Sequence, residues 1–265
     1  MTVAVVLCAH NEAHQIAQCL DAAAWADEIV VVADRCTDDT VALARRYTER
    51  VVEGAWPNEG ARRHAGIDAA TADWILELDA DERITPELAA EIRKIDDANA
   101  AFDYALIPFD NYVGQTLVRY GWGGSFGSSG VMRLFRKGAK QWGIARSHPG
   151  VSFTGKRGPN LTGRMIHYVD KDISDMIARL NRYTTNRARD LREEGIQGSL
   201  PGDVRRLFTR FFKCYVQRRG YREGAYGLLI AVMAALFPLL STLKARLETG
   251  ETGQARGPGE MPPEG

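Results

Sequence analysis

The sequence predicts an α/β fold, a largely parallel sheet with helices on both faces, followed by a helical region in the last third of the chain. Three observations predict it. Uninterrupted apolar runs alternate with segments of helical periodicity over the first eighty residues, which is the pattern of buried parallel strands and their crossovers. A length of 265 residues suits one domain of this class with an appendage. Third, residues 225–243 carry no charged side chain, which indicates an apolar helix in the last third of the chain.

The first half of the chain alternates strands and helices in order. The expected strands cover residues 3–7, 28–32, 50–53 and 74–78, and the helices between them cover 12–24, 40–47 and 60–70. Pro86 after Thr85 marks a further helix start. Right-handed crossovers make such strands parallel, and ligands bind at the carboxyl ends of parallel strands.

Composition and cysteine spacing indicate which kinds of partner and which cellular compartment to expect. The 34 basic and 34 acidic residues balance, so no overall charge indicates nucleic acid as a partner. The four cysteines are scattered without metal-ligand spacing, which is typical of reduced thiols. The N-terminal segment lacks the basic residues of a secretion signal. We therefore expect the catalytic part in the cytoplasm.

Polar clusters follow three of the expected strands. They are residues 10–12, 34–40 and 79–81, which the topology brings to one edge of the sheet. Side chains two residues apart on a strand point the same way. The carboxylates of Asp79 and Asp81 are therefore expected to face one point, where a divalent cation would offset their repulsion. The alternative is that these acids only form a turn before the helix that begins near Thr85.

Together these motifs resemble the signature of family 2 glycosyltransferases, which have the GT-A fold. The matching segments are Asn11-Glu12, Val30 to Thr40, Gly60 to Gly66 and Leu78 to Arg83. Trp25 to Val32 and Leu180 to Thr184 further resemble the branch that contains sugar transferases of lipopolysaccharide core assembly.

The resemblance implies a role for each matching residue. Asp34 would bind the uracil of a UDP-sugar, and Arg63 would approach the base or the diphosphate. Asp79 would contact the ribose or a metal ion, and Asp81 would bind Mg²⁺ or Mn²⁺ and thereby take part in catalysis. Asn11 and Glu12 would line the nucleotide pocket. The reaction would invert the anomeric carbon, with the cation acting as a Lewis acid on the leaving diphosphate.

Inverting transferases of this type need a general base, usually Asp or Glu. No acidic residue lies between Asp110 and Asp170, and the family's usual His-Glu is replaced by His148-Pro149. We therefore expect His148 as the base, with Asp110 as the second candidate. The missing acid also leaves open a catalytically inactive nucleotide-sugar-binding protein. A nucleotidyltransferase is disfavoured, because no glycine-rich basic loop follows the first strand.

The acid-free stretch is strongly basic and has two interpretations. It contains nine basic residues: Arg119, Arg133, Arg136, Lys137, Lys140, Arg146, Lys156, Arg157 and Arg164. One interpretation is a solvated surface. The other, which we prefer, is an acceptor lobe for an anionic lipid or a phosphorylated sugar, with Trp122 and Trp142 as platforms on which a saccharide ring stacks.

The last third predicts helices that contact a membrane. Residues 172–194 carry an apolar stripe at helical spacing that is interrupted near Thr184, which predicts a helix packed against the core domain. Residues 204–219 place aromatic side chains on one face with basic ones around it, as in helices of a membrane interface. Residues 225–243 are at the lower length limit for a span. We expect this segment to dip into one leaflet of the membrane. A true membrane span is the second alternative, and a helix buried in a soluble protein is the third. Residues from 250 onward are expected to be disordered.

The expected organisation is a catalytic domain over residues 1–170, a helical region over 171–247 and a disordered tail over 248–265. Residues 1–100 would bind the nucleotide sugar and 101–170 the acceptor. The expected function is metal-dependent transfer of a hexose from a UDP-sugar to a glycolipid or lipid-linked saccharide acceptor. The protein would work on the anionic cytoplasmic surface of a bacterial inner membrane.

Overall fold

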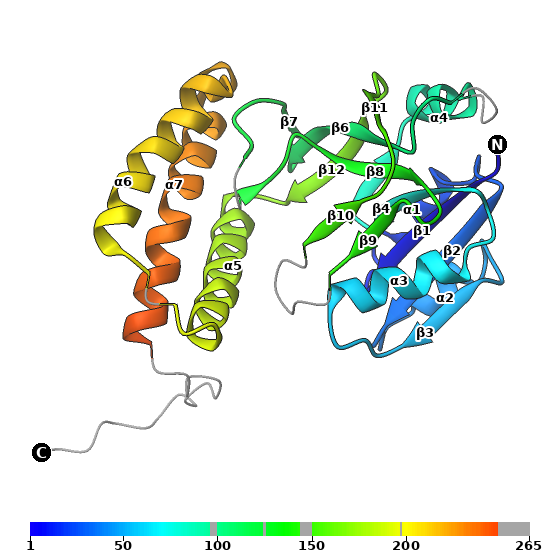
Figure 1. Cartoon of the computed structure of the whole chain (residues 1–265), viewed down its shortest axis with the longest axis horizontal. Helices are drawn as coiled ribbons and strands as arrows, with labels where there is room; N and C mark the ends of the chain where they lie inside the picture. Colours follow the sequence, from blue (N-terminus) through cyan, green and yellow to red (C-terminus); the bar gives the residue numbers. More distant parts are fainter. Residues whose placement is uncertain (96–99, 124–125, 144–149, 197, 249–265) are drawn as a thin grey trace, which may run out of the picture.

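A computed structural model describes residues 1–95, 100–123, 126–143, 150–196 and 198–248, and its N-terminal part is built on a mixed sheet (Figure 1). The strands of the main sheet are β1 Val3–Ala9, β2 Glu28–Asp34, β3 Val51–Gly54, β4 Trp74–Asp79, β5 Glu82–Ile84, β6 Tyr104–Val113, β7 Thr116–Val118, β8 Gly130–Arg136, β11 Arg157–Asn160 and β12 Met165–Asp170. A separate two-stranded sheet pairs β9 Lys140–Trp142 with β10 Val151–Phe153.

The sheet order is β3-β2-β1-β4-β8-β6-β12-β5. The first four strands are parallel, as expected, whereas β8 runs antiparallel to both β4 and β6. Cys8 is in register with Asp79, and Ala9 is in register with Ala33. The carboxyl ends of β1, β2 and β4 therefore meet at one edge, where the polar clusters follow them.

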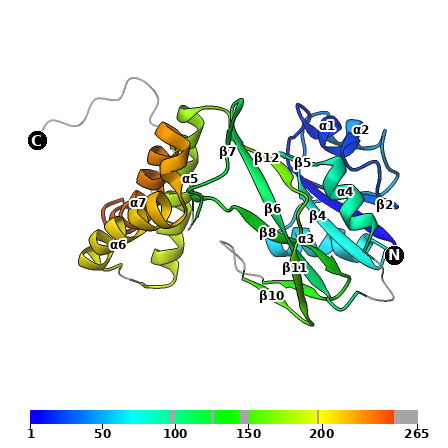
Figure 2. The same cartoon turned by 90° about the horizontal axis from the view of Figure 1, so that it is seen from above.

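Helices cover both faces of the parallel strands, which confirms the predicted fold class. They are α1 Ile16–Asp21, α2 Thr40–Ala44, α3 Glu59–Ala69 and α4 Pro86–Arg93. Alternate residues of β1 face opposite sides: Val6 packs with Ile67 of α3, and Val5 shares a core with Leu20 of α1 and Leu88 of α4. Figure 2 shows α3 on the side of the sheet away from α1 and α4.

The last third forms a helical region beside the sheet (Figure 1). It consists of α5 Ile173–Glu193, α6 Leu200–Phe212, a π turn over Lys213–Gln217, a 3-10 turn over Gly220–Glu223 and α7 Gly224–Leu247. A second hydrophobic core joins this region to the sheet, because Trp122 and Phe126 pack among side chains of α5 and α7. The predicted boundary at residue 170 falls between β12 and α5.

The expected helix over 172–194 is continuous in the structure, as α5. Where its apolar stripe is interrupted, the Thr184 hydroxyl donates to the Leu180 carbonyl at 2.9 Å, so this polar side chain is accommodated within the helix. The short strand β5 was not expected. It exists because residues 82–84 pair with β12, which lies some eighty residues later.

The apolar helix of residues 225–243 lies inside α7. By length and composition Gly220–Leu247 could cross a membrane, but half of its most apolar window is buried within the protein. α7 packs against both α5 and α6, while Leu228 and Val232 on it are exposed, so this packing is compatible with each of the three alternatives. The expected tail from 250 onward lies outside the described residues.

Candidate active site

The loops after β1 and β2 are tied together at the carboxyl edge of the sheet. Asn11 adopts a left-handed backbone with φ of 57°, and its Oδ1 accepts a hydrogen bond from the Thr37 amide at 2.8 Å. The Glu12 amide donates to the Thr40 hydroxyl at 2.7 Å. The structure therefore holds the two predicted nucleotide-pocket residues of the first loop against the second.

Asp34 ends β2 among cationic side chains. Its side chain is 6% exposed and pairs with Arg35 at 2.9 Å and with Arg62 of α3 at 3.5 Å. The Trp56 amide donates to its other oxygen at 3.3 Å. A carboxylate held in this way has a fixed orientation at the strand edge, which is what recognition of a planar base requires.

Asp79 is bound by two arginines. Its Oδ1 pairs with Arg63 at 2.8 Å, and its Oδ2 contacts Arg133 of β8. Burial alone would raise the pKa of Asp79, but the charges of Arg133 and Arg63 hold it far below its usual range. β4 ends at Asp79, and Asp79 is not among the three side chains whose possible ligand atoms converge, so its role as a metal ligand beside Asp81 stays a prediction.

The structure instead brings Asp81 close to Glu82 and to His167 of β12. The ligand atoms of these three side chains lie within 4.8 Å of one another. Both Glu82 oxygens are engaged, since Oε2 accepts from the Asp79 amide at 2.9 Å and Oε1 pairs with Arg133 at 2.7 Å. Burial raises the pKa of Glu82 to about 7, against the opposing charge of Arg133. Asp81 and His167, 3.6 Å apart, are therefore the residues with atoms available to a cation.

Asn111 of β6 sets the orientation of His167. Its Nδ2 donates to the Ser128 carbonyl at 2.9 Å, so its Oδ1 faces His167 Nδ1 at 2.8 Å and accepts a hydrogen bond from it. The Nε2 atom of His167 is thereby directed at Asp81, as in histidines that ligate metals and donate their other ring proton. One carboxylate and one imidazole fit Mn²⁺ better than Mg²⁺, which prefers oxygen ligands.

His167 and Arg133 were missed by sequence reasoning. Arg133 was assigned only to the basic acceptor lobe, and His167 was given no functional role. Both reach the site through pairings between strands distant in the chain, β8 with β4 and β12 with β6. No local motif around either residue could have indicated this.

Three buried arginine nitrogens at the edge have no partner among the described residues. They are Nη1 of Arg63, Nε of Arg62 and Nε of Arg133. Arg63 is only 5% exposed, and its guanidinium lies 5.1 Å from the centre of the Trp142 ring. A buried donor without a partner costs free energy, so these atoms are suited to an anion that enters beside Asp34 and Asp79.

Asp110 does not face the cluster. Asp110 and Asn111 are consecutive on β6, so their side chains point to opposite faces of the sheet. The Asp110 carboxylate pairs with Arg119 at 2.8 Å and with Arg164. Burial acts to raise the pKa of Asp110, but these two hydrogen-bonded arginines lower it. Asp110 therefore lies on the other face of β6 from the cluster, and its role as a general base stays a prediction.

The two tryptophans proposed as stacking platforms have other environments. Trp122 is 2% exposed, and its Nε1 donates to the Val118 carbonyl at 2.6 Å, so its ring is part of the second core and cannot receive a sugar. Trp142 donates to buried Glu77 at 2.6 Å. His148, the first candidate base, lies outside the described residues.

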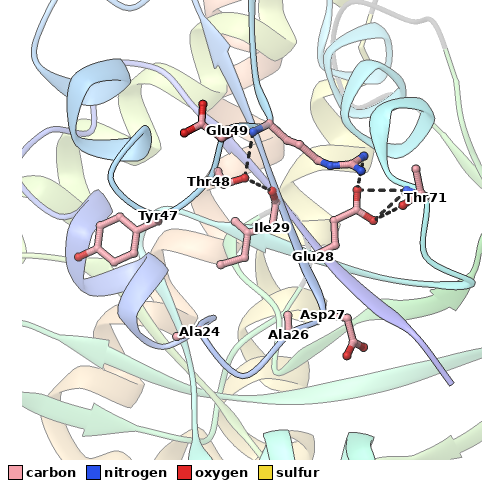
Figure 3. A pocket seen from close by; sticks show the side chains of 10 residues that line it. Ala24, Ala26, Asp27, Glu28, Ile29, Tyr47, Thr48, Glu49 and Thr71 are labelled. Carbon is pink, nitrogen blue, oxygen red and sulfur yellow. Dashed lines mark hydrogen bonds and ion pairs between the residues drawn. The ribbon is translucent and has the colours of Figure 1, made fainter.

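A cavity of about 480 Å³ lies at the other edge of the sheet, at the start of β2 (Figure 3). Its polar groups satisfy one another: the Thr48 hydroxyl donates to the Ile29 carbonyl at 2.7 Å, and Glu28 pairs with Arg50 at 2.7 Å and accepts from the Thr71 amide at 2.8 Å. These contacts engage Glu28, Thr48, Arg50 and Thr71 with one another or with the backbone. The cavity is also remote from the polar clusters that follow β1, β2 and β4, so the candidate site stays at the carboxyl edge.

Comparison with known proteins agrees with this geometry. Residues 4–148 match the family model described as glycosyl transferase family 2. The lipopolysaccharide core biosynthesis glycosyltransferase LpsC of Rhizobium meliloti (strain 1021) is 24% identical over 254 residues, which cover 91% of this chain and 90% of LpsC. The uncharacterized glycosyltransferase RP128 of Rickettsia prowazekii is 26% identical over 252 residues, covering 89% and 84%.

Among solved structures, the crystal structure of S. aureus TarS 1-349 has a TM-score of 0.50 at 14% identity and covers 92% of this chain and 88% of its own. At this identity the likeness concerns the fold alone.

Proposed function

Because this chain belongs to glycosyl transferase family 2, we propose that it is a glycosyltransferase that moves a hexose from a UDP-sugar to a glycolipid or lipid-linked saccharide. LpsC, similar over nearly the whole length, is named for lipopolysaccharide core biosynthesis, which supports a membrane-lipid saccharide as the acceptor. The single observation that carries the donor assignment is the buried, unpartnered Nη1 of Arg63 at the carboxyl edge.

The donor would lie across the ends of β1, β2 and β4. Asp34 would accept a hydrogen bond from the uracil, in the fixed orientation that its arginines impose. The diphosphate would take up the free donors of Arg62 and Arg63. Charge-assisted bonds from arginine to phosphate are among the strongest that a protein offers.

Asp81 and His167 would hold a divalent cation, Mn²⁺ in preference to Mg²⁺. When bound, the cation would neutralise negative charge that develops on the departing diphosphate. Asn111 keeps His167 in the required tautomer, and Arg133 neutralises both Asp79 and Glu82, so that these carboxylates do not compete for the cation.

The transfer would be a single inverting displacement. The acceptor hydroxyl oxygen forms a bond to the anomeric carbon, the bond from that carbon to the diphosphate breaks, and UDP leaves with its electron pair. The hydroxyl proton passes to a general base. Since Asp110 points to the other face, His148 stays our candidate for this base.

The membrane assignment moves from α7 to α6. We define the α6 stripe as Val204, Phe208, Phe212 and Val216, spaced four residues apart and exposed; Phe208 and Phe212 are 68% and 53% exposed. Basic residues such as Arg205 and Lys213 lie on the same segment. An exposed apolar stripe with cationic flanks is typical of a helix lying on an anionic membrane surface. This supports a location at the cytoplasmic face of the inner membrane.

Calorimetric titration with UDP, with and without Mn²⁺, tests the donor and metal sites. We expect wild-type protein to bind UDP more tightly in Mn²⁺. Asp81→Ala should lose at least about tenfold of that affinity, roughly 1.4 kcal/mol, because it removes the carboxylate ligand. Asp68→Ala, which removes an exposed carboxylate from α3, is the matched control and should bind as wild type.

Two results would count against the proposal. If UDP does not bind in either condition, the donor assignment is wrong. If UDP binds but no labelled sugar reaches a lipid acceptor extract from any UDP-hexose tested, the inactive nucleotide-sugar-binding alternative gains support.

A further inference from the structure

A basic cavity lies where the sheet meets the helical region. Its volume is about 590 Å³, and β6, the loop after β7 and the turn after α6 contribute to its walls. Four arginines line it: Arg119, Arg164, Arg218 and Arg219. None of them belongs to the donor or metal site described above.

The cavity has an excess of positive charge. Asp110 pairs with both Arg119 and Arg164, so one carboxylate is shared between two guanidinium groups. Among the described residues, no ion pair joins Arg218 or Arg219 to an acidic side chain; Arg218 Nη1 lies 3.7 Å from the Cys214 sulfur. Convergent guanidinium groups with free donors match the geometry of a phosphate.

The local backbone holds these arginines in place. The Gly121 amide donates to the Arg218 carbonyl at 3.0 Å, and Gly123 has no side chain, so the Arg218 guanidinium lies directly against the loop. Arg219 itself has a φ of 59°, in the left-handed region that disfavours a residue with a Cβ. Strain of this kind persists at positions that serve binding more often than elsewhere.

The cavity adjoins the α6 stripe. Val216 ends the stripe, and the next residue, Gln217, lines the cavity. Leu106 and Pro108 of β6 also line it, whereas Asn111, of opposite parity on this strand, holds His167. The cavity is thus on the opposite face of β6 from the metal cluster.

We propose that this arginine cavity binds the phosphate of an anionic phospholipid whose acyl chains lie along the α6 stripe. A phosphate site that borders an exposed apolar stripe fits a lipid headgroup better than a free phosphate. The proposal rests on the proposed function only in placing the protein at a membrane. It adds a headgroup site that orients the molecule there.

Flotation with vesicles tests the proposal directly. The probes are vesicles of phosphatidylcholine alone and of phosphatidylcholine with added phosphatidylglycerol. We expect wild-type protein to prefer the anionic vesicles, and R218Q/R219Q to lose at least about tenfold of its affinity for them while binding neutral vesicles as before. R218K/R219K, which keeps both charges, should retain the preference.

The matched control is R45Q/R46Q, which removes two adjacent exposed arginines from α2 and its end. If it weakens binding as much as R218Q/R219Q, the attraction is general electrostatics and the cavity proposal is wrong. It is equally wrong if R218Q/R219Q, with an unchanged circular dichroism spectrum, binds as wild type. Full competition by inorganic phosphate at equal phosphate concentration would assign the cavity to the free ion and overturn the lipid assignment. UDP titration of wild-type protein is run in parallel, so that failure of the donor assignment is recognised separately.

Discussion

At the residue scale, His167 decides how the metal site responds to pH. Burial lowers its pKa, but the hydrogen bond to Asp81 and the charges of Asp81, Glu82 and Asp79 outweigh burial and raise it above its usual value. A proton and a metal ion compete for Nε2. We therefore expect Mn²⁺ affinity to fall as the pH drops through the raised pKa of His167, by up to about tenfold per pH unit, measured by titration calorimetry.

His167→Gln should bind Mn²⁺ weakly and with a flatter pH dependence, because Gln does not titrate. His14→Gln removes an exposed histidine and serves as the control that keeps the wild-type profile. An unchanged profile in His167→Gln would show that the cation is held elsewhere.

At the element scale, one buried ion pair joins α5 to the end of β12. Arg179 donates two hydrogen bonds to Asp170, both 2.8 Å long, and a third to the Phe126 carbonyl at 2.9 Å. Its guanidinium also lies 4.1 Å from the centre of the Phe126 ring. Arg179→Ala leaves Asp170 buried and unpaired, so we expect the free energy of unfolding to fall by about 3–5 kcal/mol in urea titrations.

Replacing both partners in R179M/D170L should restore much of that loss, since no charge is then left buried without a partner. Arg189→Ala changes an exposed arginine on the same helix and should alter stability by less than about 0.5 kcal/mol. A loss in Arg179→Ala no larger than in Arg189→Ala would mean that the ion pair does not hold α5 to the sheet.

At the scale of the whole molecule, α6 would present the proposed membrane-binding surface, and α7 packs against α6. F208S/F212S removes two exposed rings, each worth about 1 kcal/mol of transfer into lipid when partly inserted. We therefore expect roughly thirtyfold weaker partition into phosphatidylcholine vesicles, measured by flotation.

I173S/I177S removes two exposed isoleucines at the same four-residue spacing on α5 and should partition as wild type. Equal losses in the two variants would indicate that apolar surface in general, not the α6 stripe, drives the association.

The order of the first strands and helices could be predicted from the sequence, and so could the edge at which the site lies. Continuous apolar runs such as residues 3–7 and 74–78 specify buried strands locally, and Pro86 after Thr85 specifies a helix start. The family could also be predicted, and was confirmed, because its motifs are short segments that can be recognised directly in the sequence. Asp34 and Arg63 consequently lie where the motifs place them.

Only the tertiary structure decided which side chains share a site. His167 reaches Asp81 because β12 pairs with β6 and β5, and Arg133 bridges Asp79 and Glu82 because β8 inserts beside β4. The same long-range packing buries Trp122, turns Asp110 to the other face and encloses α7 between two helices. Periodicity and capping act over a few residues, so they can be recognised in the sequence. Pairing between strands fifty or more residues apart depends instead on how the whole core packs.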